Sequence, residues 1–113
     1  MFNRGMVEPE ALSVDDRIKF TWGCTEMFGG FEFMHHQYLQ GEMPPEIWNR
    51  WEETLKFWVT YPGVQQWWYG KPSPFSARFS KLVQQSILEG YTPERPGAWE
   101  EWMRTGKVSA DKC

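Results

Sequence analysis

The amino-acid sequence predicts an all-α protein: an antiparallel bundle of three main helices with short connecting and C-terminal helices. Apolar side chains recur every three or four positions over several turns, which is the period of a helix. Proline and glycine interrupt these runs at intervals typical of helix ends, and no stretch alternates β-branched residues as a strand would. A length of 113 residues suits one domain, and an aromatic content of 18% predicts a core of few, large side chains.

The first main helix is predicted over about 14–40. Ser13, followed three residues later by Asp16, resembles a capping box with aspartate in place of glutamate. A stripe of apolar and aromatic side chains then follows the helical period: Phe20, Cys24, Met27, Phe31, Met34 and Tyr38. This stripe predicts about five turns of helix with a buried face.

Further apolar side chains widen this stripe. Because Ile18, Trp22 and Phe28 lie beside it, we expect the first helix to be covered on more than one side. Gly29 and Gly30 interrupt the helix near its middle, where glycine lowers helix stability relative to alanine. A close helix crossing at this point would explain the two glycines, and a kink is the alternative.

The second main helix is predicted over 45–60, with Pro45 in its first turn. Its apolar stripe is Trp48, Trp51, Leu55 and Trp58. The sequence Tyr-Pro-Gly at 61–63 ends this helix, because proline cannot continue the hydrogen-bond ladder and glycine permits a turn. A short connecting helix over 63–69 is expected to follow.

The third main helix is predicted over 74–89, with Ser73 as its N-cap and Pro74 at its first position. The face that would pack inward is Phe75, Phe79, Leu82, Val83 and Ile87. Gly90 should end this helix. A possible short helix over 98–104 completes the predicted elements.

These patterns divide the chain into three parts. Residues 1–12 show no clear period and are expected to be irregular, 13–90 form the helical domain, and 91–113 form a C-terminal extension. The predicted core is drawn from all three main helices: Phe20, Met27, Phe31, Trp48, Trp51, Leu55, Trp58, Phe79 and Val83.

Charge and cysteine content narrow the class of protein. The formal net charge of −3 argues against nucleic-acid binding, which normally needs a basic patch for the phosphates. Two cysteines do not make a disulfide framework, so we expect a cytoplasmic protein. No segment approaches the length of apolar sequence that spans a bilayer, so we expect a soluble chain. No motif calls for a cofactor.

The histidines offer one metal-binding possibility. Glu32 and His35 form a Glu-x-x-His pair, the spacing that directs both ligands inward in di-iron helical bundles. Such a site needs further ligands, which a two-fold homodimer could supply. The alternative is structural: Glu32 and His36 form a surface pair four residues apart, and His35 caps the aromatic stripe.

Surface aromatic residues are the other candidate site. The residues that could contact a protein partner are Tyr61, Trp67, Trp68, Tyr69, Trp99 and Trp102. Trp67 and Trp68 point about 100° apart on a helix, which would leave one of them free to contact a partner. We favour the alternative that the short helix is wedged between two longer ones and buries both rings. Trp99 and Trp102 either fold back over a groove or form a recognition element.

Parts of the chain resemble a set of uncharacterised bacterial proteins. The similarity covers roughly 8–90 and includes Pro-Glu-Ala-Leu-Ser at 9–13, the tryptophans of the second helix, and the Pro-Gly turn followed by Trp67-Trp68. It continues through Phe75, Phe79 and Val83. These relatives look like short helical domains, often behind an N-terminal transmembrane helix that this chain lacks. The resemblance implies no activity, cofactor or catalytic residue.

The sequence therefore predicts a non-catalytic module that binds a protein partner, or itself, through surface aromatic residues. Trp and Tyr dominate binding hot spots because they bring a large, rigid contact area with a polar tip. The alternative is a metal-binding protein or enzyme that uses Glu32 and His35. A small ligand held between the helices is a third possibility.

Overall fold

The computed structural model describes residues 2–70, 74–92 and 97–107, and its regular elements are all helical. In chain order they are α1 (Phe2–Val7), the 3-10 turn η1 (Pro9–Ala11), α2 (Val14–Leu39), α3 (Pro45–Trp58), α4 (Pro62–Gly70), α5 (Ala77–Glu89) and α6 (Ala98–Thr105). No strand occurs in these ranges, which confirms the predicted all-α class.

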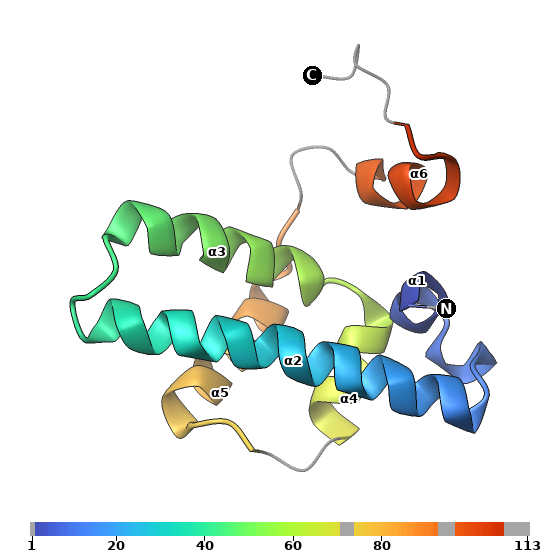
Figure 1. Cartoon of the computed structure of the whole chain (residues 1–113), viewed down its shortest axis with the longest axis horizontal. Coiled ribbons are helices and arrows are strands. Elements are labelled where there is room, and N and C mark those ends of the chain that lie inside the picture. The colour runs from blue at the N-terminus through green and yellow to red at the C-terminus, as the bar shows by residue number, and fades with distance from the viewer. Residues whose placement is uncertain (1, 71–73, 93–96, 108–113) are drawn as a thin grey trace.

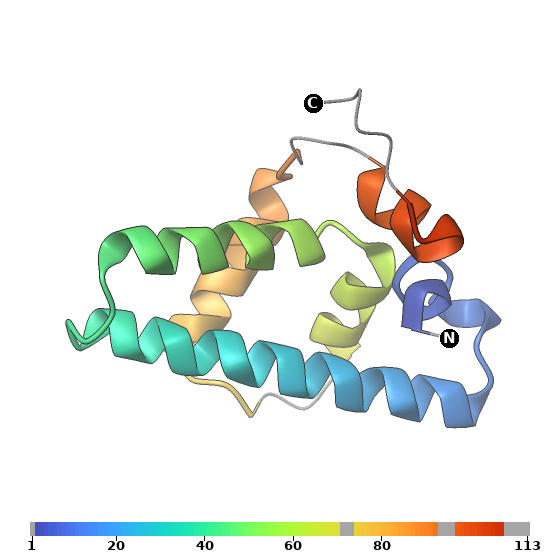
Figure 2. The same ribbon diagram turned by 45° about the horizontal axis from the view of Figure 1, so that its top comes forward.

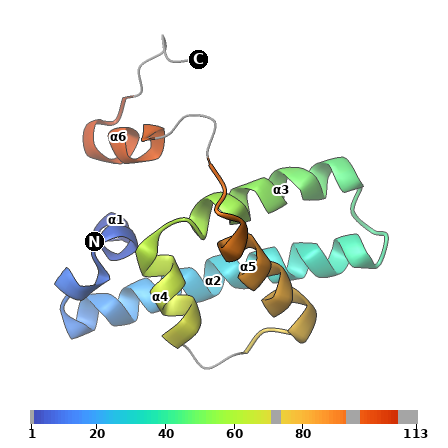
Figure 3. The same ribbon diagram turned by 180° about the vertical axis from the view of Figure 1, so that it is seen from behind.

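The long helix α2 organises the fold (Figure 1). Helix α3 returns antiparallel beside α2. Helices α4 and α5 lie on one side of α2: they are behind it in Figure 1 and in front of it in Figure 3. Helix α5 crosses α2 and α3 at an angle. The opposite side of α2 has no helix over it.

Capping and burial explain where α2 begins and how it faces the core. The Ser13 side chain accepts a hydrogen bond from the backbone N–H of Asp16 at 3.1 Å, as the capping pattern predicts. The face turned toward the other helices is buried: Phe20, Cys24, Phe28 and Phe31. Phe28 lies among rings from two other helices, with its centroid 5.0 Å from that of Trp67 and 6.5 Å from that of Phe79.

The predicted core is confirmed in large part. Six of its members are buried: Phe20, Phe31, Trp48, Leu55, Phe79 and Val83. Trp51 was expected in the core but is exposed. Trp51 lies about 60° around the axis of α3 from the buried Trp48, and its side chain is 44% exposed.

The expectation of an irregular segment over 1–12 is wrong. Most of this segment forms α1 and η1, and Met6 and Leu12 belong to the buried core. Helix α1 packs against α4, whose first turn contains Pro62 and Gly63. The segment lacks a helical period because six residues give too few turns to display one.

Helix α5 begins slightly later than predicted. Its N-cap is Ser76, whose side chain accepts a hydrogen bond from the backbone N–H of Phe79 at 3.2 Å. The predicted cap, Ser73, lies outside the described residues. The helix ends at Gly90 as expected, because Gly90 adopts a φ of 66°, which favours glycine.

The short C-terminal helix α6 is confirmed, and it folds back toward α1 and the end of α3 (Figure 2). The ring of Trp99 meets that of Trp58 edge to face, with 5.1 Å between centroids. The Tyr61 hydroxyl donates a hydrogen bond to the Glu100 carboxylate. These two contacts attach α6 to the turn between α3 and α4.

Candidate binding surface

The outward side of α2 carries large apolar side chains that no other element covers. The exposed fractions are 68% for Val14, 51% for Ile18, 66% for Trp22 and 63% for Phe33. These four residues and Gly29 share one side of the helix, and we refer to them as the α2 outer face. Large apolar side chains exposed along one side of a helix make that side a candidate contact surface.

The expectation that α2 is covered on more than one side is wrong, because its outer face is exposed. Ile18 and Trp22 point away from the core, whereas Phe28 points into it. The physical reason is the arrangement of the neighbours. Helices α1, α3, α4 and α5 all lie on the side of Phe28.

The two glycines of α2 are not explained by packing within the chain. A Cβ atom added at Gly29 or at Gly30 would meet no atom within 4 Å, so the close helix crossing expected there is not made by any described element. The helix also continues through both residues without interruption. Gly29 instead leaves a gap on the outer face between the bulky side chains of Trp22 and Phe33.

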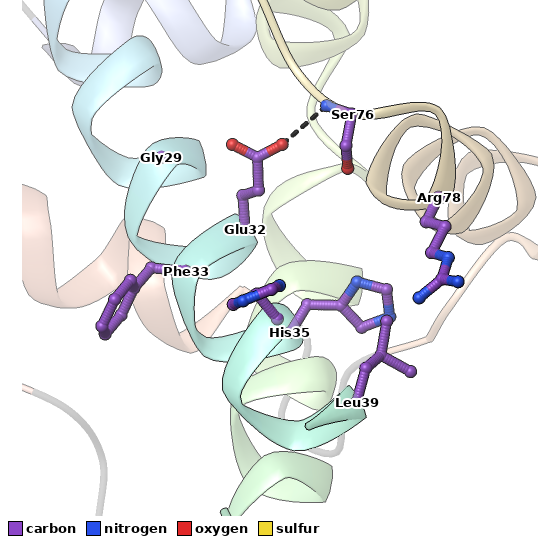
Figure 4. Close-up of a pocket in the computed structure, with 8 residues that line it drawn as sticks. Gly29, Glu32, Phe33, His35, Leu39, Ser76 and Arg78 are labelled. Atoms are coloured by element: carbon purple, nitrogen blue, oxygen red, sulfur yellow. Dashed lines mark hydrogen bonds between the residues drawn. The ribbon is translucent and has the colours of Figure 1, made fainter. Parts of the chain in front are cut away.

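A cavity of about 480 Å³ adjoins this gap, between the second half of α2 and the start of α5. Its lining combines an apolar wall with polar and basic groups: Gly29, Glu32, Phe33, His35, His36, Leu39, Ser76 and Arg78. Figure 4 shows Glu32 reaching from α2 toward Ser76, while Phe33 points to the other side of the helix. The cavity therefore extends the α2 outer face sideways toward α5.

Glu32 has a structural partner in this cavity. Its carboxylate accepts a hydrogen bond from the backbone N–H of Ser76 at 2.7 Å, at the N-cap of α5. A carboxylate is favourable at this position because the first N–H groups of a helix lack partners and carry partial positive charge. Glu32 thus joins α2 to α5.

His35 is packed between aromatic rings, with its centroid 5.2 Å from that of Trp48 and 6.2 Å from that of Phe79. Burial lowers the pKa of His35, and the nearby Arg78 lowers it further, against the opposing effect of the Glu52 and Glu32 carboxylates. The imidazole is therefore neutral at pH 7 and contributes mainly to packing.

This arrangement bears on the metal-binding alternative. Within the described ranges, no three His, Cys, Asp or Glu side chains lie close enough to hold a metal ion. Glu32 and His35 would be two ligands without a third among the described residues, and Glu32 already accepts a hydrogen bond from Ser76.

The six aromatic residues predicted to bind a partner differ in whether they are buried or exposed. Tyr61, Trp67 and Trp68 are buried, so they do not present a contact surface, and the expectation for them as surface residues is wrong. The alternative that a wedged short helix buries both tryptophans is the one found. Helix α4 is enclosed because α1 and α2 both pack against it.

The other three aromatic residues differ in exposure. Tyr69 and Trp102 are exposed, while Trp99 is partly buried and contacts the core. Tyr69 lies at the end of α4 and Trp102 lies on α6, and Figures 1 and 3 show these two elements well apart. They do not form one patch.

Residues of the α2 outer face were not among the predicted site residues, although a signal for them is present in the sequence. The helix carries two apolar stripes on opposite sides, one through Phe20 and Phe31 and one through Ile18 and Trp22. A short chain has too few helices to cover both sides of a 26-residue helix. One stripe should therefore remain exposed.

Comparisons with known proteins add no assignment: no protein-family model matches the chain, and no curated protein or solved structure is similar to it. None of the helices in the described part of the chain is both long and apolar enough to span a bilayer.

Proposed function

We propose that this protein is a non-catalytic interaction module that binds a protein partner through the α2 outer face. The observation that carries the proposal is the exposure of Trp22 and Phe33 on a side of α2 that no described element covers. Burial of these two rings would remove a large apolar area from water, and each fully buried aromatic contributes about 1.5–3 kcal/mol.

The surroundings of the two rings favour a protein partner. Asp15, Lys19 and Glu26 are exposed along the same side of α2, so a charged rim borders the apolar centre. This distribution, with large aromatic anchors inside a polar border, is typical of protein interfaces. The rim has both signs of charge, whereas a phosphate backbone would require a basic surface.

Tyr69 and Trp102 remain secondary candidates, because each is exposed outside the α2 outer face. Each is a single large side chain rather than part of a continuous apolar strip. Isolated exposed apolar residues are common on protein surfaces, so these two positions have a weaker claim to a partner.

A photo-crosslinking experiment tests the proposal. A photoreactive phenylalanine analogue would replace Trp22 or Phe33 in the full chain, and Leu88 would be the matched control because it is an exposed apolar residue on α5. Irradiation of expressing cells should give defined covalent products at positions 22 and 33 and none at position 88. Mass spectrometry would then identify the captured chain.

The affinity of the purified protein for that chain should fall at least tenfold in the Trp22→Ala variant, about 1.4 kcal/mol, and should be unchanged in Leu88→Ala. The proposal would be abandoned if positions 22 and 33 gave no product, or if Trp22→Ala bound as tightly as the parent.

A further inference from the structure

We propose that the partner is a second copy of this chain, and that two α2 helices pack antiparallel about a two-fold axis that passes between Thr25 and Glu26. This inference rests on the proposed function, because it uses the same α2 outer face. It also accounts for Gly29, which no contact among the described residues explains.

The first argument is complementarity of size. In an antiparallel pair about this axis, Trp22 faces Gly29 of the partner subunit, because both residues lie equally far from the axis along the helix. Ile18 lies level with the partner subunit's Phe33 for the same reason. A large indole would enter the gap that glycine leaves, and the symmetry repeats each contact twice.

The second argument is the distribution of charge. The antiparallel arrangement places Asp15 level with the partner subunit's His36 and keeps it about 30 Å along the helices from the partner subunit's Asp15. A parallel arrangement would instead set Asp15 against Asp15 and Lys19 against Lys19 of the partner subunit. Like charges facing each other are unfavourable, so the charge pattern selects the antiparallel pair.

The third argument is the position of the cavity. A two-fold axis perpendicular to both helices brings the same flank of each helix together. Val14 and Ile18 lie on the flank of α2 that also carries His36 and faces the start of α5. Their apolar side chains would therefore meet the cavity of about 480 Å³ beside Phe33 and Leu39 of the partner subunit.

One contact in this arrangement is unfavourable. Glu26 lies next to the axis, so the two Glu26 carboxylates of the dimer come close together. Removing this repulsion should tighten the dimer. The Glu26→Gln variant is expected to associate several-fold more tightly than the parent, a gain that no loss of folding could imitate.

Sedimentation equilibrium of the full chain tests the association. The parent and Leu88→Ala should be dimers at micromolar concentration. The dissociation constant of the dimer should be at least tenfold higher for Trp22→Ala. Gly29→Leu should be a monomer, because leucine fills the gap meant for the indole of Trp22. A Cβ atom added at Gly29 meets no described atom within 4 Å and leucine favours a helix more than glycine does, so this variant should unfold at no lower temperature than the parent at a dilution where the parent is monomeric.

Disulfide trapping tests the direction and register. In a Cys24→Ala, Cys113→Ser background with the helicity of the parent, Thr25→Cys should form a disulfide-linked dimer on mild oxidation. Lys19→Cys should not, because the antiparallel pair separates its two copies by about 20 Å along the helices. A crosslink through position 19 would indicate the parallel arrangement and overturn the inference.

A parent that stays monomeric at millimolar concentration would also overturn the inference. So would a dimer that Gly29→Leu leaves intact. Neither result removes the proposed function, which would then depend on the photo-crosslinks: a different protein captured at positions 22 and 33 supports a heterologous partner. Absence of any captured chain there would end both proposals.

Discussion

Single glycines determine how closely two helices approach each other at the N-terminal end of the fold. A Cβ atom on Gly63 would lie 1.7 Å from the carbonyl oxygen of Gly5, so α1 and α4 touch backbone to backbone. A Cβ atom on Gly5 would in turn lie 2.6 Å from the ring of Phe20. Glycine is required at position 63 because the backbone of Gly5 cannot move aside as a flexible side chain can, and at position 5 the buried ring of Phe20 limits the room for a larger residue.

This contact predicts that Gly63→Ala destabilises the protein by about 3 kcal/mol, because α1 must move away from α4 to make room for the methyl group. Gly70→Ala, in the same helix, is the matched control: its added Cβ meets nothing within 4 Å. Urea denaturation followed by circular dichroism measures both variants. Equal stability of Gly63→Ala and the parent would show that α1 does not pack against α4.

The Cys24 thiol gives a second prediction at this scale. Burial raises the pKa of Cys24 from its ordinary value of 9.0 to about 12, so the thiol stays protonated and unreactive in the folded protein. In a Cys113→Ser variant, a thiol reagent at pH 8 should modify Cys24 only as fast as the protein unfolds. Rapid stoichiometric labelling under native conditions would contradict its burial.

The same shift makes stability depend on pH. Above pH 9 the unfolded chain releases the Cys24 proton while the folded chain retains it, so the free energy of unfolding falls as pH rises from 9 toward 12. Burial and the bond to Glu100 also raise the pKa of Tyr61, which acts in the same direction. Denaturant melts from pH 8 to pH 11 should show a smaller loss of stability in Cys24→Ala than in the parent.

At the scale of elements, local sequence signals locate the long helices well. The capping pattern at Ser13 and the apolar period predict about 14–40, and α2 spans Val14–Leu39. The six-residue helix α1 escapes such reasoning, because its position depends on Gly5 meeting Gly63, which is far away in the sequence. Short helices are stabilised by tertiary contacts that no local pattern displays.

The exposure of a side chain is harder to predict than the position of a helix. The helical period of apolar residues shows that a stripe exists, but it does not show which neighbouring element covers that stripe. The two stripes of α2 have similar composition, yet only the one through Phe28 meets other helices. Of the predicted site residues, Trp67 and Trp68 lie inside the fold, while Trp22, which was not predicted, lies outside. Only the path of the whole chain distinguishes these cases.

Helix α6 allows a prediction about a single element. Trp99 contacts Trp58, while Trp102 is exposed, so Trp99→Ala should detach α6 and Trp102→Ala should not. Limited trypsin digestion measures this, because detachment exposes the peptide bond after Arg104 in α6. Cleavage there should be several-fold faster in Trp99→Ala than in the parent. Equal acceleration by Trp102→Ala would argue against the Trp99 contact as the attachment point.

At the scale of the whole molecule, the fold is one-sided: its helices gather on one side of α2 and leave the α2 outer face without cover. A symmetric dimer would provide that cover and give each α2 neighbours on both sides. The stability of such a protein depends on its concentration, since association favours the folded state by mass action.

This dependence gives a prediction that involves no labelling or crosslinking. Over a hundredfold range of protein concentration within which the dimer forms, the Tm of the parent should rise by roughly 5 °C. The reason is that each folded chain is stabilised by association with its partner. Trp22→Ala should unfold at a Tm that does not change with concentration, and its Tm should match that of the dilute parent. The exposed side chain of Trp22 has no packing role within one chain, so its loss should leave the folded monomer intact. A parent Tm independent of concentration would contradict self-association through α2.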